Sequence, residues 1–276
     1  MLLPGRAGGI VGDMPAALRV RNRRDANVVG WVVVFVVVAL VEAIVRLFEL
    51  RNSVPPPTAT TRALVAELKT GTLAGEIEAT VVNYAQGLAI AVVVGVAVGV
   101  LIGSFRALLD ASSVLIEFLR PIPAVSLIPL AVLFFGFGAP MRRWIVAYAA
   151  LWPILMNALY GARGVDRVLH DVARTSGVGA VGRLVRVTLP ASLPSIATGV
   201  RISASIGLLV AVTAESVSGT DGVGAYMQRQ ANAFQLPELY AGIVLVGFFG
   251  YVVNRALRAA ERRLVFWAGE ERLAQR

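Results

Sequence analysis

The chain has 276 residues, of which 57% are hydrophobic and 16% are charged, and its formal net charge is +9. Soluble domains carry about 25% charged residues, so this composition excludes an ordinary soluble domain and indicates an integral membrane protein. The absence of cysteine and the single histidine, His170, exclude disulfides and thiolate or histidine metal clusters. The aromatic residues are not interleaved with the arginines, as a surface for single-stranded nucleic acid requires, so no nucleic-acid partner is expected.

Six apolar stretches are long enough to cross a bilayer, which takes about 20 residues of helix. The sequence therefore predicts an all-α integral membrane protein with about six transmembrane helices. Residues 28–258 would form the transmembrane domain, between an N-terminal tail of residues 1–27 and a C-terminal tail of residues 259–276. No small-residue cleavage site follows the first stretch, so we expect an anchored helix there. The stretches are residues 28–48, 81–102, 113–137, 144–160, 195–218 and 239–257.

The distribution of basic residues predicts the orientation of these helices. With a cytoplasmic N-terminus, the inner segments hold 17 basic residues and the outer segments hold 6. The positive-inside rule therefore favours cytoplasmic termini and a cytoplasmic loop over residues 162–192. The pair Arg142-Arg143 falls on the outer side and is the one local exception. Arg46, Arg120 and Arg201 fall inside predicted spans, where Arg46 could pair with Glu42 four residues before it.

The second stretch carries small residues at every fourth position, which lets another helix approach closely. Packing within the chain is the favoured interpretation, and a contact with a second chain is the alternative. The stripe consists of Gly87, Ala91, Gly95, Gly99 and Gly103.

The third and fifth stretches contain features that a plain membrane anchor does not need. Three prolines within nine residues cannot lie in one straight helix, and irregular backbone at membrane depth must face protein or a water-filled cavity. A carboxylate in a span is costly and is a functional candidate by default. Both could instead be structural, and Glu215 above all could be a buried hydrogen-bonding post. The candidates for a translocation pathway or gate are Glu117, Pro121, Pro123, Pro129, Glu215 and Ser216.

The polar loop of residues 162–192 is predicted to hold an amphipathic helix that ends near Gly177, a residue suited to a left-handed cap. Its apolar face would dock on a partner protein or lie on lipid headgroups, and the periodicity alone favours neither. That face consists of Val165, Val168, Leu169, Val172, Ala173 and Ser176.

The segment from Asp171 to Pro190 resembles the EAA loop of permease subunits in ATP-binding-cassette (ABC) importers, which has the pattern E-A-A-x3-G-x9-I-x-L-P. Asp171, Val172 and Val187 depart from the pattern conservatively, and the other positions match. The segment from Glu117 to Gly138 resembles a second signature, that of nitrate/sulfonate/taurine-type importers. The resemblance implies that the loop couples to an ATPase through Asp171, Val172, Ala173, Gly177, Val187, Leu189 and Pro190.

The resemblance also implies the type I importer (MetI-like) permease fold in the bacterial plasma membrane. The implied partners are two ABC ATPase subunits, a second permease copy or paralogue, and an extracytoplasmic solute-binding protein. The only lysine, Lys69, is followed by Thr70-Gly71 and forms no phosphate-binding P-loop. We therefore expect no cofactor and no enzymatic activity in this chain, with ATP and Mg²⁺ bound by the partner ATPase.

The implied solute is a sulfonate, taurine, nitrate or a similar organic anion. A pyrimidine or riboflavin precursor or an aromatic acid is the alternative solute. A secondary transporter that needs no ATPase is the alternative mechanism, but such carriers show inverted repeats, and the proline-broken third stretch has no clear mate in the sequence.

Overall fold

The computed structural model describes residues 23–48 and 54–265, and within these ranges the regular structure is helical. Two compact units can be distinguished, Met1–Thr58 and Ala59–Arg276. Five of the described helices are long and apolar enough to cross a membrane, or up to six if one bent pair counts as a single span. The predicted all-α fold with about six spans is confirmed at this level.

The first unit contains α1 (Arg23–Leu47), which begins inside the predicted tail of residues 1–27. The remainder of that tail lies outside the described residues. Near the other end of α1, Arg46 forms the predicted ion pair with Glu42. The same carboxylate accepts hydrogen bonds from the Thr58 backbone N–H (3.0 Å) and hydroxyl (2.8 Å), so the charge of Glu42 is satisfied within its own unit.

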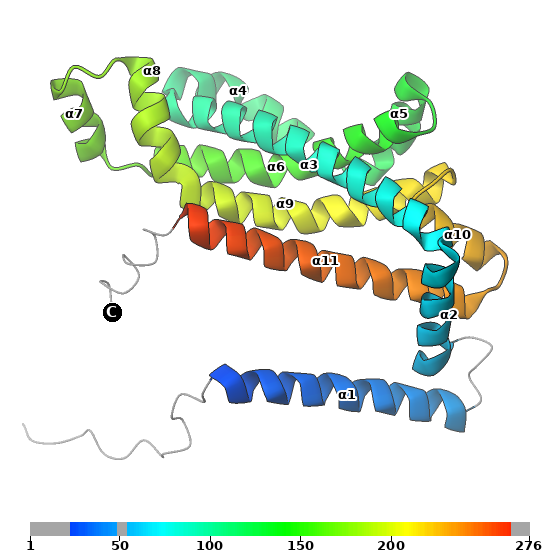
Figure 1. The fold of residues 1–276 in the computed structure, drawn as a ribbon. Coiled ribbons are helices and arrows are strands. Elements are labelled where there is room, and N and C mark those ends of the chain that lie inside the picture. Colours follow the sequence, from blue (N-terminus) through cyan, green and yellow to red (C-terminus); the bar gives the residue numbers. More distant parts are fainter. Residues whose placement is uncertain (1–22, 49–53, 266–276) are drawn as a thin grey trace, which may run out of the picture. The chain divides into compact units, whose positions relative to one another are not determined.

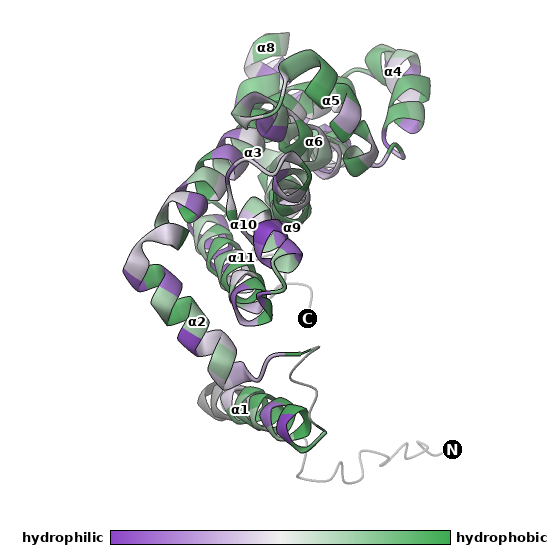
Figure 2. Cartoon of the chain, turned by 90° about the vertical axis from the view of Figure 1, so that its right-hand side faces the viewer, coloured by the Kyte–Doolittle hydropathy of each residue, from purple (hydrophilic) through white to green (hydrophobic). Residues whose placement is uncertain are grey.

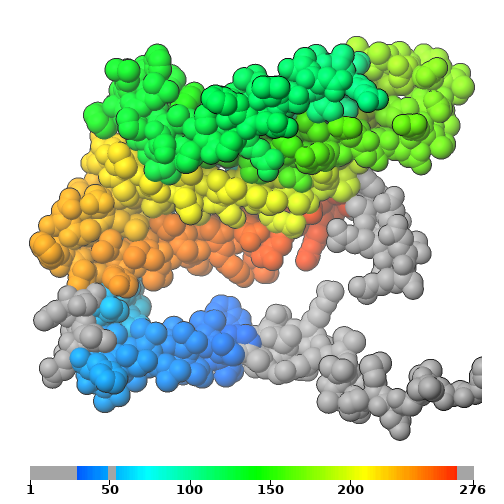
Figure 3. Space-filling view, turned by 180° about the vertical axis from the view of Figure 1, so that it is seen from behind, coloured from blue at the N-terminus to red at the C-terminus, as the bar shows by residue number. Residues whose placement is uncertain are grey.

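The second unit is organised around α3 (Thr72–Ser104), α6 (Ala139–Arg163) and α9 (Leu189–Ser218). The last long helix, α11 (Leu236–Leu264), packs on α9 and extends beyond the predicted boundary at residue 258. Figure 3 shows α9 (yellow) between the green layer that contains α6 and the orange layer of α11. The rest of the predicted tail, residues 266–276, lies outside the described residues.

The small-residue stripe of α3 packs against α6 of the same chain, which confirms the favoured interpretation. A Cβ atom added at Gly99 would lie 2.5 Å from the Leu155 carbonyl oxygen, and one at Gly103 would lie 2.5 Å from that of Leu159. On the other side of α6, a Cβ at Gly199 of α9 would lie 2.9 Å from the Pro153 carbonyl oxygen. The absence of side chains at these positions lets the three helix backbones approach closely.

We expect Gly99→Val to destabilise the protein and Gly247→Val to leave it nearly unchanged. Valine at position 99 must displace backbone atoms of α6, and overpacking of this kind costs about 1–3 kcal/mol or more. Gly247 lies in the interior of α11 with no atom within 4 Å of an added Cβ, so it controls for the change of residue type. Thermal unfolding of both detergent-purified variants measures the difference, and equal melting temperatures would contradict this packing.

The third apolar stretch is a bent pair of helices. α4 (Arg106–Leu119) is followed by a 3-10 turn, η3 (Ala124–Leu127), and by α5 (Ile128–Phe135), with a bend of 83°. The prolines account for the break, because Pro121 and Pro123 have no N–H to continue α4. Pro129 lies in the first turn of α5, where none is needed. α4 begins at Arg106, seven residues before the predicted start of the stretch. The prediction began too late because Arg106 and Asp110 lower the local hydropathy.

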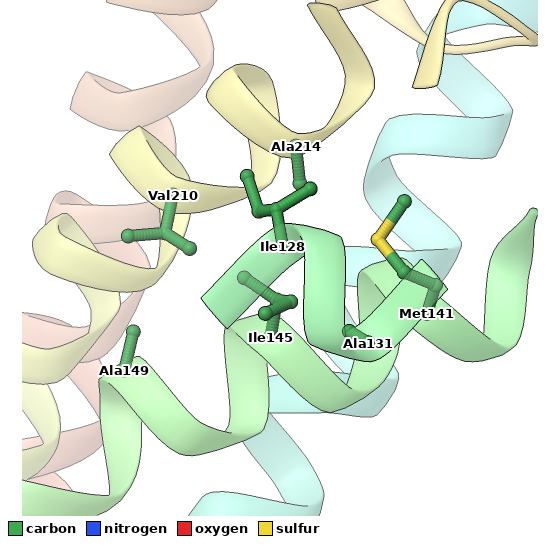
Figure 4. Packing of buried hydrophobic residues seen from close by; sticks show 7 residues of the cluster. All are labelled: Ile128, Ala131, Met141, Ile145, Ala149, Val210 and Ala214. Carbon is green, nitrogen blue, oxygen red and sulfur yellow. The ribbon is translucent and has the colours of Figure 1, made fainter. Parts of the chain in front are cut away.

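A buried cluster fixes α5 on α6 and α9. Figure 4 shows Ile128 of α5 between Ile145 of α6 and Ala214 of α9. The other members of this cluster are Ala131, Met141, Ala149 and Val210. The opposite side of α5 exposes Leu133 and Phe134, and Figure 2 shows this helix as mostly hydrophobic. Such a surface suits contact with lipid rather than water.

The short elements lie at the two ends of the second unit. α7 (Arg167–Thr175), α8 (Ala180–Arg183) and a π-helical turn, η4 (Leu184–Thr188), lie at one end, which we call the α7 end. α10 (Val223–Asn232) lies at the opposite end, the α10 end (Figure 1). α2 (Pro57–Thr70) precedes α3 in the chain. The loop of residues 162–192 and the Glu215 region are therefore at opposite ends of the bundle.

Candidate functional site

The helix of the 162–192 loop is capped at both ends by its own sequence. At the start of α7, the Asp166 carboxylate accepts a hydrogen bond of 2.9 Å from the Val168 N–H. After its end, Gly177 takes the expected left-handed conformation (φ 75°), and the Val178 N–H donates to the Ala173 carbonyl at 2.9 Å. These bonds satisfy backbone groups that a nine-residue helix would otherwise leave unpaired.

α7 presents an uncovered apolar surface. Val168, Leu169 and Val172 are 62%, 49% and 58% exposed, and we call these three residues the exposed face of α7. Val181 and Val185 in the following segment are also exposed. Ala173, which the sequence assigned to the same face, is 8% exposed and lies on the inner side of the helix. The predicted single face is therefore divided between an inner side and an exposed side.

The later part of the loop joins the exposed helix to the bundle. Val187, Leu189 and Pro190 are half-buried and lie where η4 continues directly into α9. Leu184 and Leu189 pack against the cluster that Val100, Ala158, Ala162 and Ile196 form between α3, α6 and α9. A π-helical turn within a helix is uncommon and is frequent at functional sites. The exposed Asp171 and the exposed face thus connect through one short, packed segment to a transmembrane helix.

At the α10 end, Glu215 is fully buried and joins three helices. Its Oε2 atom accepts hydrogen bonds from the Thr80 hydroxyl of α3 (2.9 Å) and the Gly224 N–H of α10 (3.0 Å). The Thr80 hydroxyl oxygen accepts in turn from the Val223 N–H at 2.8 Å. The glycine at position 222 leaves the space that the Glu215 carboxylate occupies. Glu215 therefore has the environment of a buried hydrogen-bonding residue, which is the structural one of the two interpretations given above.

Ser216 and Glu76 support the same junction. The Ser216 hydroxyl donates to the carbonyl oxygens of Val212 and Gly224, both at 3.0 Å. Glu76 accepts from the Gly222 N–H at 2.6 Å and pairs with Arg229 of α10. Both side chains hold the turn between α9 and α10.

Arg142, the exception to the positive-inside rule, is a buried structural residue. It is 2% exposed, and its guanidinium donates to the Thr220 hydroxyl (2.9 Å) and the Asp221 carboxylate (2.5 Å). This hydrogen bond from Arg142 holds the pKa of the Asp221 carboxyl below its usual range. The sequence does not reveal this role, although the charge pattern marks the position as anomalous. A paired, buried charge carries no information about topology.

The remaining pathway candidates lie at the bend. Glu117, Pro121, Pro123 and Pro129 are exposed on α4 and the segment after it. The Tyr148 hydroxyl donates to the Leu119 carbonyl at 2.8 Å and fixes the bend against α6. The bend and Glu215 are linked indirectly, because Ile128 packs in the same cluster as Ala214, the residue before Glu215. Among residues 23–48 and 54–265, no group of acidic or histidine side chains is arranged to hold a metal ion.

A solved structure of an inward-facing methionine ABC transporter (MetNI) has the same fold. The match has a TM-score of 0.61 at 18% identity and covers 70% of this chain and 95% of the other. Residues 91–266 match the family model described as "Binding-protein-dependent transport system inner membrane component", and the chain belongs to this family. It is a multi-pass permease subunit of an ABC importer and not itself an enzyme.

Relatives with assigned solutes are similar over most of their length. A putative aliphatic sulfonates transport permease protein of Bacillus subtilis is 31% identical, with 93% of this chain and 95% of the relative covered. The taurine transport system permease protein of Escherichia coli is 32% identical over 72% of each chain. A nitrate import permease protein of Synechocystis is 30% identical over 69% of each chain. The predicted resemblance to the nitrate/sulfonate/taurine group is confirmed.

Proposed function

We propose that this chain forms the translocation pathway for a small solute with an anionic group, such as a sulfonate, taurine or nitrate. Its loop of residues 162–192 couples transport to ATP hydrolysis by a separate ATPase. The solutes named for the Bacillus, Escherichia and Synechocystis relatives support this class of substrate. The observation that carries the coupling role is the exposed face of α7 on a helix capped at both ends.

The assembly that fits this role has two permease chains and two ATPase subunits, which bind ATP and Mg²⁺. An extracytoplasmic solute-binding protein would deliver solute at the α10 end. In this orientation the α7 end and both termini are cytoplasmic, as the basic residues favour. The coupling residues would be Asp171, Val172, Ala173, Gly177, Val187, Leu189 and Pro190, with Ala173 and Leu189 acting through packing rather than through contact with the ATPase.

The shape of the loop favours docking of α7 on a protein over adsorption of α7 to lipid headgroups. A helix that binds a membrane surface usually buries one long, continuous apolar face. Here, α7 has nine residues and its apolar side chains are divided between an inner and an exposed side. A short exposed face on a rigidly capped helix suits a groove on another protein.

Reconstitution of the complex in vesicles tests the proposed function. The permease, its ATPase and its binding protein are combined, and ATP hydrolysis is measured with taurine, methanesulfonate, nitrate or methionine. We expect one of the first three to stimulate hydrolysis and to accumulate inside the vesicles, and methionine to do neither. Transport that proceeds without ATP would contradict the proposal and indicate a secondary transporter.

A further inference from the structure

A pocket lies beside the proline bend, about midway between the two ends of the second unit, and no role described above uses it. Its volume is about 630 Å³, within the range of small-molecule sites. Three elements line it: the bend with Arg120, the middle and C-terminal part of α6, and the middle of α9. Its lining includes Arg120, Tyr148, Trp152, Asn157, Tyr160 and Ile206.

Arg120 differs from the other two arginines that the sequence places inside spans. Arg46 pairs with Glu42, and Arg201 lies 3.1 Å from the Glu261 carboxylate. Within the described ranges, the Arg120 guanidinium has neither a carboxylate partner nor a hydrogen bond. A charge at membrane depth costs about 2.5–3.5 kcal/mol even on insertion scales, so an unpaired one calls for a partner that the chain itself does not supply.

The position of Arg120 follows from the length of α4. Arg106 to Leu119 is 14 residues, or about 20 Å of helix, and the hydrocarbon core is about 30 Å thick. Arg120 therefore lies too far along the helix for its side chain simply to join the charges at the α7 end. The Tyr148–Leu119 hydrogen bond of 2.8 Å keeps this position against α6.

A row of aromatic side chains leads along α6 to the pocket. Trp144 stacks on Tyr148 with ring centroids 5.8 Å apart, and Tyr148 meets Trp152 edge-on at 5.8 Å. Phe135 of α5 contacts Trp144 at 6.0 Å and begins the row nearer the α10 end. Tyr148 and Trp152 themselves line the pocket. The wall thus combines one unpaired guanidinium, which attracts an anionic group, with aromatic rings that can pack against the apolar portion of an organic solute.

We propose that Arg120 and this aromatic wall form a transient site for the oxyanion group of the solute during its passage through the membrane. This inference rests on the proposed function and specifies the chemistry that the pathway selects. A guanidinium donates two parallel hydrogen bonds to the oxygens of a sulfonate, nitrate or carboxylate. It repels a solute that carries only positive charge, which excludes simple amines.

Charge substitution at Arg120 tests the site in the reconstituted complex. Transport of whichever of taurine, methanesulfonate or nitrate the wild type carries is measured for Arg120→Gln, Arg120→Lys and Arg106→Gln. Arg106 is exposed at the start of the same helix, outside the pocket, and controls for the loss of one arginine. We expect Arg120→Gln to lower the transport rate at least tenfold, Arg120→Lys to retain an intermediate rate, and Arg106→Gln to match the wild type.

Assembly and direct binding separate a solute site from a structural one. We expect Arg120→Gln to co-purify with the ATPase in normal yield, and to lose binding of radiolabelled solute to the permease–ATPase complex without binding protein. Equal transport by Arg120→Gln and Arg106→Gln would overturn the inference. So would a lower melting temperature with unchanged transport per assembled complex, which would indicate a packing or lipid-phosphate role. A wild-type complex that transports none of the three solutes would instead refute the proposed function.

Discussion

Val172→Glu is expected to separate the permease from its ATPase while leaving the membrane domain folded. Val172 is the most C-terminal residue of the exposed face of α7 and is 58% exposed, so a glutamate there is solvated in the free permease. In a docked complex the same carboxylate would be buried without a partner, which costs about 3–5 kcal/mol. This corresponds to a loss in affinity of about a hundredfold or more.

Co-purification with the tagged ATPase and solute-stimulated ATP hydrolysis measure this effect. Phe234→Glu is the matched control, because Phe234 is 88% exposed and follows α10, the helix at the opposite end of the bundle. It should retain the ATPase. Ala173→Arg is a poorer choice, since Ala173 is buried and an arginine there would disturb the loop itself. Wild-type ATPase binding by Val172→Glu would show that the exposed face is not the docking surface.

Glu215→Leu is expected to destabilise the permease, and Glu215→Gln is expected to leave its stability nearly unchanged. Leucine removes the acceptor of the Thr80 hydroxyl and of the Gly224 N–H, and each buried donor left unpaired costs about 1–3 kcal/mol. Glutamine retains one oxygen that accepts both bonds. Its amide nitrogen would replace Oε1, which has no hydrogen-bond partner.

Thermal unfolding and transport per assembled complex distinguish a structural hydrogen-bonding role of Glu215 from direct contact with the solute. Glu78→Leu serves as the control, because Glu78 is exposed on α3 and makes no hydrogen bond in the described part of the chain. We expect transport by Glu215→Gln to remain within about twofold of the wild type, because the hydrogen bonds that it preserves are the structural ones. If Glu215→Gln lowered the melting temperature of the permease as strongly as Glu215→Leu, the negative charge itself would be required.

Local patterns in the sequence were sufficient to predict the membrane-spanning helices and the proline bend. Hydrophobic length predicts spans, and two prolines as close together as Pro121 and Pro123 disfavour a continuous helix, because neither has an N–H to donate and each ring crowds the preceding turn. Boundaries were less well predicted. α9 begins at Leu189 rather than Ser195, because Pro190 lies in its first turn, where a missing N–H is tolerated, and the helix accommodates Pro194 in its interior.

The polar junction could not be predicted because its partners are distant in the sequence. Thr80 and Glu215 are 135 residues apart, and Arg142 and Asp221 are 79 apart. When only the sequence is known, every arginine between spans is counted toward the positive-inside rule. Arg142 was therefore counted as an exception to that rule, although it is buried and paired with Asp221. Similarly, helical periodicity places Ala173 beside Val172 but does not reveal which of the two the rest of the loop covers.

Cross-linking from the exposed face of α7 tests whether this face docks on the ATPase, and single-site labelling is possible because the chain contains no cysteine. Single cysteines are introduced at Val172 and, as the control, at Phe234, and the assembled complex is treated in the membrane with a short reagent that joins a maleimide, which reacts with the introduced thiol, to a photoreactive group, which inserts into a neighbouring chain. We expect a permease–ATPase adduct from position 172 and none from position 234. An adduct from position 234, or labelling of position 172 from outside intact cells, would contradict both the proposed orientation and the coupling role of the loop.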